Sequence, residues 1–201
     1  MNGLPEFFEV VQRQRACRSF RPDAVADDLV ERVLEAATFA PSAENRQPWE
    51  FVVVYDDAVR ARIGDLTRQA WRGGARSYSE ARLSPRLLAD VDRGAEGDVS
   101  GAPVLIVVCG DRRRAHEAAM AASIFPAVQN LLLAANALGL GAALTTLPTT
   151  FAAELRELLA LPDDVDPLAV VPLGRPARAL GPPRREPVSD HAHRDRYGRE
   201  W

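Results

Sequence analysis

The chain contains no lysine, and all 25 of its lysine or arginine positions are arginine. Pyridoxal-phosphate enzymes and Schiff-base aldolases need a lysine amine. P-loop nucleotide hydrolases and protein kinases need a lysine on their nucleotide phosphates. The sequence therefore excludes these four classes. If a permanently charged side chain holds a phosphate or a flavin carbonyl here, it has to be a guanidinium, which is planar and can bind with two N–H groups.

Histidine and cysteine are also scarce, with three and two residues. The chain has no zinc-protease motif, no Cys-x-x-Cys pair and no Gly-x-Ser-x-Gly elbow. His191 and His193 provide too few converging ligands for a metal site, so we expect them to be solvated. Two cysteines cannot form a disulfide framework and fit a reducing cytoplasm. We expect Cys109 to be inert packing and give Cys17 no catalytic role, although neighbouring arginines would lower its pKa. The sequence therefore predicts no catalytic side chain and no metal, and a bound cofactor would carry any redox chemistry.

Charge and hydropathy describe an ordinary globular chain of 201 residues, 47% hydrophobic and 26% charged. The formal net charge of −3 offers no basic field for nucleic acid or anionic lipid. The N-terminus lacks the pattern of a signal peptide. The most apolar stretch, residues 131–147, is shorter than the roughly 20 residues of a membrane span. We expect a soluble cytoplasmic protein that binds neither nucleic acid nor membrane.

Hydrophobic periodicity predicts an alternation of helices and strands. The helices are expected at 4–14 (with Leu4 on the apolar side), from a cap at Asp27 or Asp28 to the residues before Pro41, at 57–70, at 115–138 with a kink or restart at Pro126, and at 151–160. The strands are expected at 49–55, 103–109, 142–147 and 168–173. The rest of 57–100 has no sustained periodicity and is interpreted as mobile or variable.

The last 27 residues differ in composition from the rest. Residues 175–201 hold seven arginines, four acids and four prolines, a composition that favours extended chain over a core of its own. We therefore predict a domain at 1–174 and an arm at 175–201. Tyr197 and Trp201 at its tip would be buried against a partner subunit, with a frayed tail as the alternative.

Two features remain that suit a flat, phosphorylated ligand. Arginines occur at 15 and 18 and again at 184 and 185. The loop between the second helix and the first strand, residues 41–49, is rich in amide and hydroxyl groups. Ser42, Asn45 and Gln47 are suited to hydrogen-bonding a polar ring edge, and a structural turn is the alternative. Gly139-Leu-Gly141 is no dinucleotide fingerprint, because it follows a helix and precedes a strand.

Four segments, in this order, resemble the FMN-dependent nitroreductase family. They are Arg15-Ala-Cys-Arg-Ser-Phe20, Ala40-Pro-Ser-Ala-Glu-Asn-Arg-Gln-Pro-Trp49, the run from Gln129 to Gly141, and Val171-Pro-Leu-Gly-Arg-Pro-Ala177. The resemblance covers about residues 5–190. It implies an α+β fold with a mixed central sheet wrapped by helices. It also implies a homodimer with FMN at the subunit interface, with NAD(P)H as the electron donor and a nitroaromatic, quinone or similar small molecule as the acceptor in a ping-pong cycle.

The resemblance also implies the cofactor-binding residues. The phosphate and ribityl chain of FMN would be held by the first loop and the arm, through Arg15, Ala16, Arg18, Arg184 and Arg185. The partner subunit would line the flavin with Pro41, Ser42, Asn45 and Gln47. Backbone N–H groups of Thr145, Thr146 and Leu147 would approach the flavin ring and polarise it, an electrostatic role that needs no acid or base.

The chain departs from the family pattern at three places. Ala16 replaces a common serine and Gln14 a common basic residue. The polar pair that usually precedes the strand at 103 is missing, and only Arg93, Glu96 and Asp98 are available for the pyrimidine edge. Two alternatives to a broad-specificity reductase stay open. One is a related flavoenzyme that performs reductive dehalogenation, flavin fragmentation or heterocycle dehydrogenation, and the other is a flavin-binding protein without turnover.

Overall fold

A computed structural model describes residues 6–201 of the chain, apart from the side chain of Asp98. At its centre lies a four-stranded sheet whose strands pair antiparallel. A parallel bridge between Ala16 and Ala142 extends this sheet at its β3 edge. The predicted α+β class is confirmed. In spatial order the strands are β1 (Trp49–Val54), β2 (Val104–Asp111), β4 (Val165–Gly174) and β3 (Gly141–Ala142).

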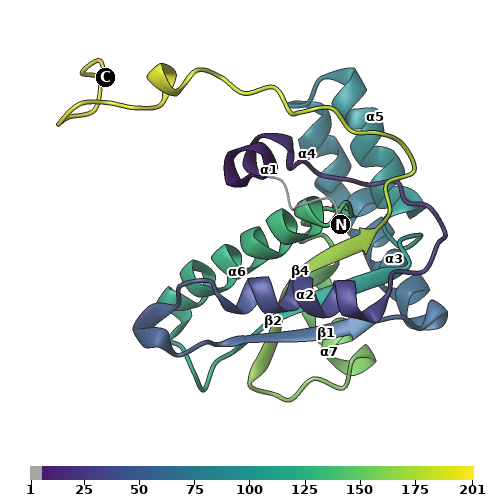
Figure 1. Ribbon diagram of the computed structural model, residues 1–201. Helices are drawn as coiled ribbons and strands as arrows, with labels where there is room; N and C mark the ends of the chain where they lie inside the picture. Colours follow the sequence, from purple (N-terminus) through teal and green to yellow (C-terminus); the bar gives the residue numbers. More distant parts are fainter. Residues whose placement is uncertain (1–5) are drawn as a thin grey trace.

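Helices cover both faces of the sheet (Figure 1). All eight residues of β2 are buried, which accounts for a continuous apolar run rather than an alternating one. Because successive side chains point to opposite faces, Ile106 packs with α2 (Asp27–Thr38) and α6 (Glu117–Ala137). Its neighbour Leu105 packs with α3 (Asp57–Ala70) and α7 (Ala152–Leu158) on the other face. Two cores thus share one central strand.

The helix α6 is apolar almost all the way round. Its length and composition alone would suit a membrane span, but eight of its residues are buried within the protein. It packs against α2, where the Asn130 side-chain amide donates to the carbonyl of Ala36 at 3.1 Å. We interpret α6 as a core helix. It runs without interruption through Pro126, so the predicted restart does not occur.

The region after α3, for which the sequence shows no sustained periodicity, is helical in the structure. Its elements are too short to repeat a periodic signal, and Arg72–Glu96 and Arg76–Asp92 ion pairs tie them together. Trp71 anchors the group, with its indole N–H donating to Asp92 at 2.9 Å. The elements are η2 (Trp71–Ala75), α4 (Arg76–Glu80), α5 (Pro85–Arg93) and η3 (Gly94–Asp98).

Three further boundaries differ from the sequence-based predictions. Helix α2 is capped by Ala26, and Asp27 and Asp28 lie in its first turn, where their charge still favours the helix dipole. The strand expected at 142–147 is the two-residue β3, followed by a bridge between Thr145 and Val170. The first helix, α1, spans Phe7–Arg13, and the predicted contribution of Leu4 lies outside the described residues. The remaining short helices are η1 (Ala43–Asn45), η4 (Pro148–Phe151) and η5 (Val188–Asp190).

The C-terminal arm leaves the body of the protein and runs past α1 into open space (Figure 1). Among the described residues, the backbone bonds between the arm and the body lie at its root. The N–H of Arg21 donates to the carbonyl of Arg175 at 2.8 Å, and the N–H of Ala177 donates to Ser19 at 3.0 Å. At the far end, Tyr197 and Trp201 are 93% and 71% exposed. A solvated tail rarely carries two bare aromatic side chains, so the tip has the composition of a contact surface.

Candidate functional site

The loop after α1, residues 14–21, is held in extended form between β3 and the root of the arm. The N–H of Cys17 donates to the carbonyl of Ala142 at 2.9 Å, and Phe20 bridges to Pro176. The approach to β3 is close, since a Cβ on Gly141 would lie 2.6 Å from the Cys17 sulfur. Gly139 ends α6 with φ +73°, a conformation that favours glycine. Gly139 and Gly141 therefore allow the loop to pack closely against the chain between α6 and β3.

Arg15 carries an unpaired buried donor. Its Nη1 donates to the carbonyl of Gly181 at 3.0 Å, but its Nε is buried without a hydrogen-bond partner. Among the described side chains no other buried nitrogen or oxygen lacks a partner. Because leaving a charged donor unpaired is costly, the Nε of Arg15 is suited to donate a hydrogen bond to an anionic ligand. It borders a cavity of about 320 Å³ between this loop, the end of α6 and the arm.

Arg18 belongs to a cluster with three arginines around one carboxylate. Asp90 on α5 accepts from Arg18 at 3.0 Å, from Arg178 at 3.1 Å and from Arg93 at 3.2 Å. The side chains of Arg18 and Asp90 are about a quarter exposed, so these charges are only partly screened by water. One carboxylate against three guanidinium groups leaves the cluster with a surplus of positive charge. The cluster can therefore accept an anion.

A second cavity, of about 340 Å³, lies between Arg18, the α4–α5 region and the segment 143–147. Trp71 forms one buried wall and Tyr78 stands at its edge. The structure brings the predicted residues Arg18, Thr145, Thr146 and Leu147 to this one cavity. A small crevice joins Arg15, Ala16 and Arg18 on the other side of the loop. Six of the predicted residues thus border two neighbouring hollows, which share Arg18, from segments about 130 residues apart.

The three amides of the segment 145–147 are not equivalent. The N–H of Thr145 donates to the carbonyl of Val170 at 2.9 Å, and the N–H of Leu147 donates to the hydroxyl of Thr145 at 3.3 Å. Among the hydrogen bonds of the described residues, none uses the N–H of Thr146. Of the three amides, that of Thr146 is therefore the one left without a partner among the described residues, and Thr146 lines the cavity.

The polar loop at 41–47 is strained. Glu44, Asn45 and Gln47 have left-handed backbone conformations, with φ of 54°, 54° and 50°. Non-glycine residues adopt this region rarely, and such strain is concentrated at functional sites. The loop is held by the N–H of Gln47, which donates to the Ser42 hydroxyl at 3.0 Å. Ser42 acts here as an acceptor, so its own O–H is still free to donate to a ligand.

Within one chain, the loop at 41–47 lines neither the cavity next to Arg15 nor the cavity next to Arg18. It lies against the first turns of α6, where the N–H of Ala43 donates to the Ser123 hydroxyl at 3.2 Å. Neither of the two cavities described above is lined by Pro41, Ser42, Asn45 or Gln47. Arg184 and Arg185 are exposed on the arm, and Arg185 donates to the carbonyl of Arg184 at 2.9 Å. Within one chain, the predicted residues therefore form one cluster and two separate segments.

Both thiols are poor nucleophiles. Burial raises the pKa of the Cys109 thiol from 9.0 to about 12. Burial also raises the pKa of Cys17, outweighing the nearby Arg178 and Arg18, which lower it. His191 pairs with Glu186 at 3.0 Å on the exposed arm, and the described residues contain no group of three metal-binding side chains.

Two of the three candidates for contacting the flavin pyrimidine edge form ion pairs with other side chains. Arg93 is paired with Asp90 at 3.2 Å, and Glu96 is paired with Arg72. Asp98 falls outside the described side chains. The residues before β2 therefore offer no free polar pair among those described.

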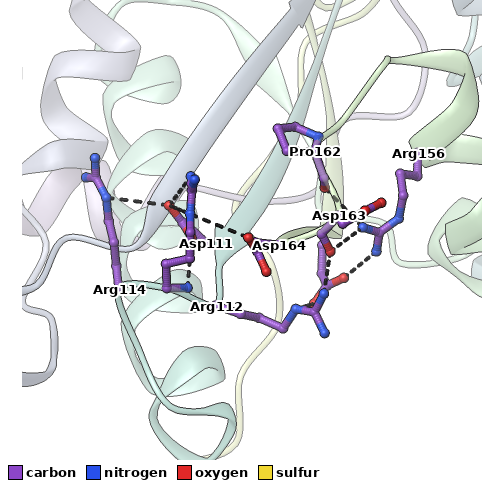
Figure 2. Close-up of polar contacts among 9 residues, drawn as sticks. Asp111, Arg112, Arg114, Arg156, Pro162, Asp163 and Asp164 are labelled. Atoms are coloured by element: carbon purple, nitrogen blue, oxygen red, sulfur yellow. Dashed lines mark hydrogen bonds and ion pairs between the residues drawn. The ribbon is translucent and has the colours of Figure 1, made fainter.

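A second charged cluster lies at the opposite end of the sheet and is structural (Figure 2). The buried Asp111 accepts from Arg113 at 2.9 Å and pairs with Arg114 at 3.6 Å. Arg156 pairs with Asp166 at 2.6 Å and donates to the carbonyl of Asp163 at 2.7 Å. Each of these guanidinium groups has a carboxylate partner. Arg112, which pairs with Asp166 at 3.1 Å, ties the end of β2 to the start of β4. The cluster leaves no donor group for a ligand among its described residues.

The nitroreductase family model matches residues 11–175 of the chain. The protein belongs to the nitroreductase family. It is 30% identical over 179 residues to a protein of Methanothermobacter thermautotrophicus with the provisional name NADH dehydrogenase/NAD(P)H nitroreductase, covering 88% of this chain and 80% of that one. It is also 30% identical over 185 residues to an iodotyrosine deiodinase of Haliscomenobacter hydrossis, covering 86% and 80%.

A solved structure extends the comparison to the cofactor. A protein of Desulfovibrio desulfuricans, provisionally described as a nitroreductase in complex with FMN, superposes with a TM-score of 0.74 at 28% identity, covering 97% of this chain and 99% of that one. The predicted family resemblance is confirmed by these matches. Within this nitroreductase-family chain, sequence reasoning missed Asp90, Gly94 and Arg178. No local motif marks them, because they gather around Arg18 only in the folded chain.

Proposed function

We propose that the chain is an FMN-dependent oxidoreductase that takes electrons from NAD(P)H and passes them to a small acceptor such as a nitroaromatic or a quinone. One observation carries the proposal: the buried, unpartnered Nε of Arg15 lies beside a cluster with surplus positive charge. An anion with a ring fits this arrangement, since the cavity next to Arg18 has the apolar wall of Trp71 and the free amide of Thr146. The FMN in the Desulfovibrio desulfuricans structure supports it.

The residues have separate roles in this proposal. Arg15, the backbone at Ala16, and Arg18 would hold the phosphate and ribityl chain. The amide of Thr146, within the segment 145–147, would donate to the ring and stabilise negative charge as it develops there. When bound, FMN supplies the acceptance of two electrons from NAD(P)H and their delivery to the acceptor. No side chain is required to act as acid or base.

We further propose that the site is completed by a second copy of the chain. The loop at 41–47 and the arginines at 184 and 185 lie away from Arg15 and Arg18 within one chain. Some of the exposed large apolar side chains lie on α1, α6 and the arm, where such an interface would cover them. They include Phe7 (67% exposed), Phe8 (72%) and Phe125 (38%). In a homodimer, the partner's loop and arm would bring Ser42, Asn45, Gln47, Arg184 and Arg185 to the flavin. A cytoplasmic location belongs to the same proposal, because NAD(P)H is a cytoplasmic reductant.

The experiment is the visible flavin absorbance of the purified protein, recorded before and after anaerobic addition of NADH or NADPH. We expect bound flavin whose absorbance is bleached by the donor and restored by nitroaromatic or quinone acceptors. A flavin that stays oxidised would favour flavin binding without turnover. Failure to bind FMN even when it is added would contradict the proposal.

Reductive dehalogenation is the second candidate, favoured by the 30% identity to the iodotyrosine deiodinase. The test compares release of iodide from an iodophenol or iodotyrosine with reduction of a nitroaromatic, using the same reduced protein. Iodide release at a rate comparable to nitro reduction would favour the dehalogenase.

A further inference from the structure

Arg18 is placed by the helix that borders the cavity, and not by the loop that carries it. Its Nη1 donates to the carboxylate of Asp90, 72 residues away on α5, at 3.0 Å. Its aliphatic stem lies across Gly94 at the start of η3, where a Cβ would come within 2.8 Å of the Arg18 Cδ and 3.2 Å of its Cβ. The guanidinium end of Arg18 is thus held by an ion pair, and its aliphatic stem fits against Gly94 because Gly94 has no side chain.

Steric room, and not backbone conformation, explains the glycine at position 94. Gly94 has φ −57° and ψ −49°, which any residue adopts in a helix. Glycine weakens a helix relative to alanine, so the helix alone gives no reason for it. The close approach of Arg18 gives one.

Asp90 leaves most of the Arg18 donors free. A guanidinium has five N–H donors, and the described contacts of Arg18 to Asp90 use Nη1. The same carboxylate also holds Arg178 from the root of the arm at 3.1 Å. Asp90 therefore holds arginines from two distant segments side by side, and each donates to it through one nitrogen, Nη1 of Arg18 and Nη2 of Arg178.

We propose that Asp90 and Gly94 are positioning residues that orient Arg18 for the phosphate or ribityl chain of FMN. This inference rests on the proposed FMN site. It makes the affinity for the cofactor depend on the α5–η3 segment, which lies outside the four segments of family resemblance and bears no motif of its own.

The charge of Asp90 gives the test a clear sign. If Asp90 acted only through its charge, Asp90→Asn would make the site more positive and FMN would bind more tightly. If Asp90 positions Arg18, the same substitution releases the guanidinium and FMN binds more weakly. Gly94→Ala changes no charge, and its added methyl displaces the Arg18 stem. We expect both variants to raise the Kd for FMN at least about tenfold, the effect of losing one charge-assisted hydrogen bond.

The measurement is the Kd of the full-length protein for FMN, by quenching of flavin fluorescence. The control is Asp65→Asn, which removes the same charge on α3, where Asp65 pairs with Arg68; its Kd should stay within about twofold of wild type. Thermal unfolding of each FMN-free variant shows whether it is folded.

A double-mutant cycle separates positioning from a general structural effect. In an Arg18→Gln background, Asp90→Asn and Gly94→Ala should add little further loss of FMN affinity. Additive losses in that background, or unchanged or tighter FMN binding by the single variants, would overturn the proposal while leaving FMN binding intact. A wild-type protein that binds no FMN would overturn the proposed function as well.

Discussion

Arg15 is the residue whose state in the structure points most directly to a ligand, because its buried Nε has no partner. We expect Arg15→Gln to raise the Kd for FMN about tenfold or more, through loss of a charge-assisted bond to the phosphate. The Kd for riboflavin, which lacks the phosphate, should change little. Calorimetric titration of both ligands measures the difference, with the exposed Arg32→Gln as a control of equal charge. Equal losses for FMN and riboflavin would place Arg15 away from the phosphate.

The two thiols give a prediction about pH at the same scale. Burial raises the pKa of Cys109 to about 12 and raises that of Cys17 above 9.0, so the folded protein has almost no thiolate at neutral pH. We expect iodoacetamide to modify neither thiol until the protein is unfolded, as counted by mass spectrometry. Because the unfolded thiols ionise first, these groups should cost stability as the pH rises above 9.0. Rapid labelling of Cys17 in the native protein would contradict this assignment.

Single residues also show where sequence reasoning stops. Arg15 and Arg18 were within reach because they lie in a segment that resembles the family, and Thr146 because it follows shortly after another, the run that ends at Gly141. Asp90 and Gly94 were not, because their relation to Arg18 spans more than 70 residues and depends on how α5 packs. Arg178, three residues after Arg175, looks like part of a solvated arm until its pairing with Asp90 is known.

Among the elements, the helix at 57–70 and the strands β1 and β2 were the most predictable. The apolar run at β2 and the aromatic and β-branched run at β1 allow few alternatives, and both were placed to within a few residues. The elements from η2 to η3 were not, because they are short and their Arg72–Glu96 and Arg76–Asp92 ion pairs join residues 24 and 16 apart, which no local pattern reveals. The expected strand at 142–147 failed because its chain turns away from β4 after Ala142 and returns only at Thr145.

The end of β2 provides a stability prediction at the element scale. Hydrogen bonds from Arg113 hold the pKa of the buried Asp111 below its ordinary 3.8. The ionised Asp111 therefore stabilises the folded state above pH 3.8, and this stabilisation is lost as the pH falls through the lower pKa of the folded state. We expect Asp111→Asn to lower the free energy of unfolding by roughly 1–3 kcal/mol at neutral pH. The difference should shrink in acid.

Urea unfolding at several pH values measures this effect. The matched control is Asp164→Asn, because Asp164 is half exposed and lies 3.9 Å from the same arginine; exposed pairs of this kind contribute little. A stability difference that is independent of pH would show that the carboxylate charge of Asp111 is not what holds β2 to the chain before β4.

At the scale of the whole molecule, the described fold of a single chain is complete while the proposed site is not. The sheet and both cores lie within residues 6–174, and the chain beyond Gly181 makes its described backbone bonds within itself. The aromatic side chains at its tip, and those of α1, are exposed. The described contacts of a single chain therefore give no reason for the arm, whereas the proposed binding of FMN between two chains would give one. The domain boundary and the arm's partner thus stay predictions that the oligomeric state can test.

Removal of residues 182–201 tests both together. Because this segment lies outside the cores, we expect the shortened chain to stay folded with nearly unchanged circular dichroism. We expect it to dissociate more readily in analytical ultracentrifugation and to bind FMN more weakly, since Arg184 and Arg185 are lost with it. The double variant Arg184→Gln, Arg185→Gln keeps the arm, so it should weaken FMN binding while leaving the dimer intact. If the full-length and shortened chains are both monomers that bind FMN equally, the arm is a tail and the site lies within one chain.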